Sequence, residues 1–143
     1  MPDSSAVDAA LISKLSSDAA LRALAPDGVY FDVAKATAKQ FVIVSLVAAV
    51  DEPMFKARAF EDAIYLVKFV GFSSEAEPLA AATTIAAAAR IDTLLEQGTL
   101  TITGYSLMCL QRVERVRYTE VDEVDRSIRW QHRGGRYQLV VSS

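Results

Sequence analysis

The last third of the chain contains two runs with the composition of β-strands, residues 107–113 and residues 127–141, separated by a charged stretch at residues 114–125. Branched and aromatic side chains are frequent in both runs, which predicts strands. No part of this region has the pattern of a reaction centre. We therefore expect two strands joined by a charged link, an arrangement suited to contacts between subunits.

The other elements define the fold class. Helices are predicted at residues 6–15, 18–24 and 75–97, and strands at residues 29–33, 41–47 and 61–72. Strands that come in runs, without regular alternation with helices, predict an α+β domain with helices on one face of a mainly antiparallel sheet. At 143 residues the chain is expected to form one domain, 1–143, which can bury a core without a metal or a disulfide.

Capping and turn residues set the expected ends of these elements. The long helix starts either with Ser74 and Glu77 as a capping box or with Pro78 in its first turn, and Gly98 ends it. Gly134 and Gly135 lie between two strand-like halves and predict a hairpin turn. The expected buried stripes are Ala9, Ile12 and Leu15 on the first helix and Ile85, Ala88, Ile91 and Leu95 on the long helix.

Charge is unevenly distributed. The net charge of −3 argues against a general nucleic-acid binder, yet residues 101–143 carry a net +2, and all their lysine or arginine residues are arginine. Arginine is enriched at protein interfaces, whereas lysine is depleted. Arg115 and Arg117 would share one face of an extended strand, with Val116 on the other. The candidate interface arginines are Arg112, Arg115, Arg117 and Arg129; the alternative is a solvated strand face with local ion pairs.

Residues 51–60 are predicted to form a loop because they contain a proline and several charges. The loop also carries large apolar side chains with no alternation that would bury them. Two interpretations remain open: the loop packs back on the core, or it docks on a neighbouring subunit through Met54, Phe55, Lys56 and Arg58.

No residue pattern predicts catalysis, a cofactor or a metal site. His132 is the single histidine, expected to face solvent from a strand, and Cys109 is the single cysteine, expected to be a buried structural thiol. Carboxylates at positions 120, 122, 123 and 125 lack the regular spacing and central glycine of a calcium loop, so a surface cluster is expected. We expect a non-enzymatic protein.

Neither export nor membrane insertion is expected. The first residues lack the basic region of a signal peptide, and the apolar run at residues 41–50 is too short to span a bilayer. The sequence predicts a soluble protein, intracellular when made.

The order and patterning of these segments resemble a known family. The chain is similar to the tail terminator or tail-completion proteins of long-tailed phages and related gene-transfer particles. The similarity lies in Asp18-Ala-Ala-Leu-Arg-Ala-Leu24, Gly28-Val-Tyr30, the strand at 41–47, Tyr65-Leu-Val-Lys-Phe-Val70, the helix ending Ile91-Asp-Thr-Leu-Leu95, and residues 109–116 leading to 130–141.

This resemblance implies a virion protein without cofactors that forms a homo-hexameric ring. The ring would cap the major tail tube protein, stop polymerisation and join the tail to the head-completion or connector protein, with DNA passing through its lumen without sequence-specific binding. The protein would be in the host cytoplasm before assembly and then at the head–tail junction. A head–tail connector or adaptor of the same particle is the alternative, and a small ligand-binding or enzymatic domain is a rival from another class.

Overall fold

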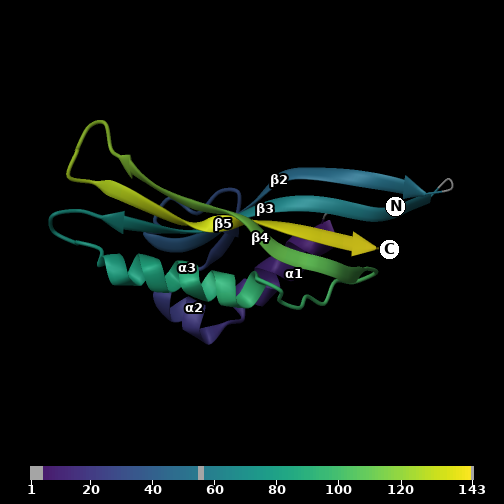
Figure 1. Cartoon of the computed structure of the whole chain (residues 1–143). Coiled ribbons are helices and arrows are strands. Elements are labelled where there is room, and N and C mark those ends of the chain that lie inside the picture. Colours follow the sequence, from purple (N-terminus) through teal and green to yellow (C-terminus); the bar gives the residue numbers. More distant parts are fainter. Residues whose placement is uncertain (1–4, 55–56, 143) are drawn as a thin grey trace.

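A five-stranded sheet forms the body of the protein in the computed structural model. The structure describes the backbone of residues 5–54 and 57–142, and it describes their side chains except at positions 51–59. The strands are β1 (Val29–Phe31), β2 (Gln40–Met54), β3 (Ala57–Ser73), β4 (Ser106–Val121) and β5 (Arg129–Ser142), in the order β1-β2-β3-β5-β4. β1 is parallel to β2, and the other pairs are antiparallel. Helices α1 (Ser5–Ser16), α2 (Ala19–Leu24) and α3 (Ala81–Leu95) lie on one side of the sheet (Figure 1). The α+β prediction is confirmed.

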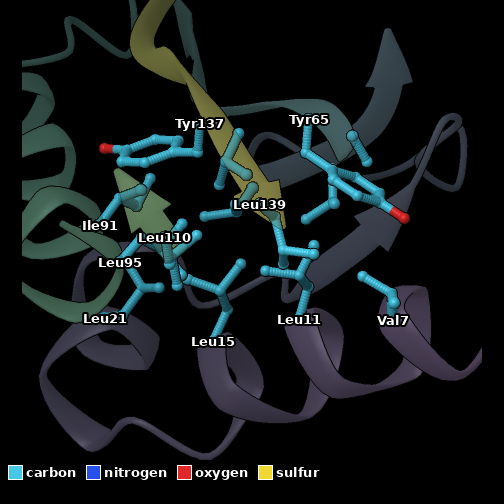
Figure 2. Packing of buried hydrophobic residues seen from close by; sticks show 14 of the residues in the cluster. Val7, Leu11, Leu15, Leu21, Tyr65, Ile91, Leu95, Leu110, Tyr137 and Leu139 are labelled. Atoms are coloured by element: carbon cyan, nitrogen blue, oxygen red, sulfur yellow. The ribbon is translucent and has the colours of Figure 1, made fainter. Parts of the chain in front are cut away.

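The core lies between the helices and the sheet. Residues Val7, Leu11 and Leu15 on α1, spaced by four, point at Leu139 and Tyr65 on the sheet (Figure 2). Of the predicted stripe on α1, only Leu15 is buried; Ala9 is exposed and Ile12 is half-buried, so the stripe is wrong in phase.

The two large core tyrosines keep their hydroxyls bonded. Tyr65 donates to Asp8 Oδ1 at 2.6 Å, and Tyr137 donates to Asp92 Oδ1 at 3.1 Å. Burial is the main cause that raises the pKa of both phenols. Each tyrosine thereby ties one helix to the sheet, because an unpaired buried hydroxyl would be destabilising.

α3 differs from its prediction in start and in phase. It begins at Ala81, because Ser74 Oγ accepts the Glu77 N–H at 3.1 Å in a turn before the helix. Its buried residues are Thr84, Ala87, Ile91 and Leu95, so Ile85, 49% exposed, and the half-buried Ala88 were wrongly assigned to the core. The Thr84 hydroxyl donates to Gln131 at 3.3 Å, which allows a polar residue in the stripe.

Residues 51–54 and 57–60 are strand and not loop, which corrects the sequence prediction for them; residues 55 and 56 lie outside the described residues. In this part of β2 and β3, Glu52 lies opposite Phe60 and Pro53 opposite Arg58. Pro53 lacks an N–H, and it is tolerated because it lies at a register shift on β2, where β1 does not reach and no described strand pairs with the outer edge. We call residues 46–54 and 57–60 the arm; it projects beyond the helices at one end of the molecule (Figure 1).

The charged link predicted at residues 114–125 is mostly strand, because β4 runs to Val121. Its charges are tolerated on an edge strand by cross-strand partners, as between Glu114 Oε2 and Arg136 Nη1 at 3.4 Å. Gly134 and Gly135 are not a turn either: they lie within β5, opposite Lys68 and Arg115 respectively. The connection of β4 to β5 is residues 122–128, at the end of the molecule opposite the arm (Figure 1).

A second, smaller cluster lies on the sheet face away from the helices. Phe41, Ile43 and Val70 are buried there with Ala38 from the segment between β1 and β2. Trp130 extends the cluster, with its ring centroid 5.2 Å from that of Phe72. This segment covers only the β1 end of the face, so the rest of that face remains unpacked by any described helix.

Candidate subunit interface

A groove of about 390 Å³ lies between α3 and the edge strand β4. α3 packs mainly on β5 and β3, and this position leaves the space beside β4 open. The helix side of the groove carries the apolar residues Ile85, Ala88 and Ala89, and also Asp92, which pairs with Arg112. Beyond this ion pair, the sheet side carries Arg115, Arg117 and Arg133. We call the surface formed by Ile85, Ala88, Ala89, Arg115, Arg117 and Arg133 the arginine groove.

The arginines of the groove are arranged by strand register. Arg115 lies opposite Gly135, and Arg117 lies opposite Arg133. Arg115 and Arg117 therefore share the face that carries Tyr137, with Val116 on the other, as the alternation of the sequence predicted. Arg117 and Arg133 are like charges in directly opposed positions, which is unfavourable in a sheet.

The positive charge of the groove is not neutralised within the subunit. Arg112, at one end of the groove, forms an ion pair with Asp92 Oδ1 at 2.9 Å. Among residues 5–54 and 57–142, Arg115, Arg117 and Arg133 form no ion pair. The groove can therefore bind an anionic group beside an apolar surface, which suits an acidic segment of a protein.

A compact polar cluster lies on the opposite face of the sheet. His132 stacks on Tyr118 with ring centroids 4.3 Å apart, and Lys68 Nζ donates a hydrogen bond to the Tyr118 hydroxyl. Glu120 Oε1 lies 2.8 Å from His132 Nε2, the distance of an ion pair when the imidazole is protonated. Sequence reasoning missed this cluster because its members come from three strands.

His132 is buried, only 7% exposed, which corrects the prediction of a solvent-facing residue. It lies opposite Val70 in the register and under the ring of Tyr118, so its neighbours cover it from both sides. Burial, and secondly the charge of Lys68, lower the pKa of His132, while Glu120 opposes this shift. The imidazole is therefore neutral near pH 7. A hollow of about 350 Å³ beside it, lined also by Trp130, is the strongest feature in favour of a ligand-binding rival.

No other chemistry-bearing group is assembled in the described part of the chain. Cys109 is half-buried rather than buried, and it is free. The described His, Cys, Asp and Glu side chains form no group of three or more that could hold a metal. None of the described helices combines the length and apolar character needed to cross a membrane.

The structure separates the predicted interface residues into three sets. Phe55 and Lys56 lie outside the described residues, and Met54 and Arg58 lie at the tip of the arm with only their backbone described. Arg129 is exposed at the start of β5. The three β4 arginines line the same groove; Arg112 is ion-paired with Asp92 inside the subunit, whereas Arg115 and Arg117 have no ion-pair partner among the described residues. Their role at an interface stays a prediction.

Two features of this surface could not be assigned from the sequence. Arg133 and Ile85 join the groove only through the register of β5 and the rotation of α3. The arm adds exposed apolar residues near its base, namely Leu46, Val47 and Val50, which are 37%, 46% and 59% exposed. Val47 lies at a register shift, which leaves it without a cross-strand partner.

Comparison with known proteins found similarity only at the level of structure. No family model matches the chain, and no curated protein matches it. A chain in a solved structure described as the virion of a native gene transfer agent particle superimposes with a TM-score of 0.61 at 21% identity, covering 96% of this chain and 95% of that chain. A second solved structure, whose name describes no activity, gives a TM-score of 0.56 at 13% identity, covering 97% and 96%. At these identities the likeness shows a shared fold.

Proposed function

We propose that this chain is a structural protein of a phage-like particle, a tail terminator that assembles as a hexameric ring on the end of the tail tube. The observation that carries the proposal is the shared fold, over 96% of the chain, with a protein of a gene transfer agent virion. The ring ends tube polymerisation, joins the tail to the head connector at the head–tail junction, and lets DNA pass through its lumen without sequence-specific contacts. The protein resides in the host cytoplasm before assembly.

The distribution of exposed side chains supports a role in assembly. The arm carries exposed apolar residues at one end of the sheet, and the 122–128 loop carries Val124, 97% exposed, at the other end (Figure 1). The arginine groove lies between these ends. Three separate contact surfaces on a small subunit suit a protein that touches its own copies and two other components, because each contact needs its own surface.

The second candidate is a head–tail connector or adaptor of the same particle. The shared fold supports it equally, since the solved neighbour is described as a whole virion and not by its place in the tail. The two roles differ in the partner that is bound first. A terminator purifies with tail tubes, whereas an adaptor purifies with DNA-filled heads. Catalysis is the weakest candidate, because the solved neighbour with the same fold is described as part of a virion.

Co-production with the major tail tube protein of the same particle tests the proposal. Tubes made with the chain are expected to have uniform lengths and a ring at one end in negative-stain electron micrographs, and tubes made without it are expected to be long and irregular. Unchanged tube lengths, together with no chain bound to tube ends, would refute the terminator role. Recovery of the chain with heads alone would favour the adaptor.

A shortened arm gives a matched variant for this assay. Glu52 and Phe60 are paired, so an Asn-Gly turn can replace residues 53–59 and close the hairpin. Pairing of Phe60 with Ser142 is retained, so the subunit is expected to fold. We expect this variant to keep its circular dichroism spectrum and lose tube capping. Normal capping would show that the arm is not the tube contact.

A further inference from the structure

The loop that joins β4 to β5 presents an acidic tip. Asp122 Oδ1 accepts hydrogen bonds from the N–H groups of Val124 and Asp125, at 2.8 and 3.0 Å. Asp125 Oδ1 accepts bonds from the N–H and the hydroxyl of Ser127, at 3.0 and 2.6 Å. These bonds fix the backbone so that Val124, 97% exposed, stands between Glu123 and Asp125. We call residues 122–125 the acidic tip.

The acidic tip and the arginine groove are complementary in charge and in polarity. The tip has three carboxylates around one valine. The groove has three arginines without ion-pair partners among the described residues, next to the half-exposed Ile85. The backbone N–H groups of Asp125 and Val124 lower the pKa of Asp122, so this carboxylate keeps its negative charge further into acidic solution than an ordinary aspartate.

The tip cannot reach the groove of its own subunit. Arg117 and Asp122 are five residues apart along one extended strand, a separation of roughly 16 Å, and the strand runs away from the groove. The groove also contains apolar helix residues, which favours a protein segment over the phosphates of DNA. An acidic segment with an exposed valine is available on every other copy of the chain.

We infer that the acidic tip of one subunit docks in the arginine groove of the next subunit. Val124 packs on Ile85 and Ala88, and the carboxylates face the groove arginines. This inference rests on the proposed ring, because it names the contact that holds neighbouring subunits together. The tip and the groove are different surfaces, so the contact is head-to-tail, and repeating it around an axis closes a ring.

Charge reversal tests the contact, with the mass of the purified full-length chain followed by light scattering at low salt. Arg117→Glu and Glu123→Arg are each expected to weaken self-association roughly tenfold or more, since like charges then face each other. The double variant R117E/E123R carries both reversals in every copy, so each reversed tip meets a reversed groove. Its association is expected to recover. Arg22→Glu, an equal charge change on the exposed surface of α2, should have no effect.

Each outcome bears on the inference separately from the proposed function. Rings that withstand both single reversals, or a double variant that fails to recover while remaining folded, overturn the contact even where the wild-type chain still caps tubes. If the Arg117→Glu chain still forms rings but no longer binds tubes, the groove binds the tube protein and not a neighbouring subunit, and the inferred contact is overturned. A closed dimer, or a chain that is monomeric both alone and with tubes, contradicts the head-to-tail ring. Recovery of the double variant together with failed tube capping supports the contact and refutes only the terminator role.

Discussion

Gly134 should be one of the least replaceable residues of the sheet. It lies within β5, between β3 and β4, where a Cβ atom would be 2.1 Å from the carbonyl oxygen of Val67 and 2.5 Å from the Cα of Lys68. Both are backbone atoms, so no side-chain rotation can relieve the overlap. Gly134→Ala therefore requires β3 and β5 to separate, which strains the hydrogen bonds between two long strands.

The size of the effect follows from this geometry. Overpacking in a close-packed region costs about 1–3 kcal/mol, and separation of the strands weakens one or two backbone hydrogen bonds worth about 1 kcal/mol each. We expect Gly134→Ala to lower the free energy of unfolding by about 3 kcal/mol. For a domain of 143 residues this corresponds to a fall in melting temperature of about 10 °C.

Urea and thermal unfolding of the subunit, followed by circular dichroism at one protein concentration, measure this loss. Gly104→Ala is the matched control: Gly104 has φ +83°, which strains alanine, but a Cβ there meets no atom within 4 Å. The control should cost about 1 kcal/mol from backbone strain alone. A Gly134→Ala cost no greater than that of the control would refute the close approach of the strands and would match the turn that the sequence suggested.

Three further outcomes are expected. Arg90 hydrogen-bonds Asp18 and lowers its pKa to about 2, so this ion pair stabilises the fold above pH 4 and is lost as the pH falls towards 2. Asp18→Asn should lower the free energy of unfolding in urea by about 1–2 kcal/mol at pH 7 and by much less at pH 2. Burial lowers the pKa of His132, so the imidazole takes up a proton more readily in the unfolded chain, and stability should fall from pH 7 towards pH 5. His132→Gln should remove this part of the pH dependence and leave assembly intact. A variant with the same pH profile as the unsubstituted chain would contradict this expectation. Cys109→Ala should cost about 1 kcal/mol or less, because the thiol is half-buried, and should not change particle assembly.

The fold class could be predicted because it depends on local composition. Strand-like runs and one long alanine-rich helix are visible in the sequence, and their order excludes a regular β-α alternation. The sequence could not predict which face of the long helix is buried, because two stripes have helical spacing and both continue through Ile91. One stripe contains Ile85 and Ala88, and the other contains Thr84 and Ala87. Only the packing against β5, where Thr84 meets Gln131, selects between them.

The strand segments that the sequence did not predict have two physical causes. Charges and proline usually mark loops, but they are tolerated on strands with a free edge, as in β4 and in the arm. Paired glycines usually mark turns, yet Gly134 and Gly135 lie where neighbouring backbones come too close for a side chain. The arginines on β4 could be proposed as an interface from composition, whereas Arg133 enters the groove only through the strand register.

The register of β4 and β5 also explains why the groove should favour assembly. Arg117 lies directly opposite Arg133, and a like-charged pair across two strands opposes folding by about 0.2–1 kcal/mol. An acidic group from a bound partner would relieve this repulsion only while the partner is bound, whereas an acidic side chain of the same subunit would relieve it at all times. Within the subunit, Asp92 pairs with Arg112 and with none of the other groove arginines. A subunit with an unneutralised groove is therefore stabilised by binding an acidic partner, and each docked tip adds to the stability of the subunit that receives it.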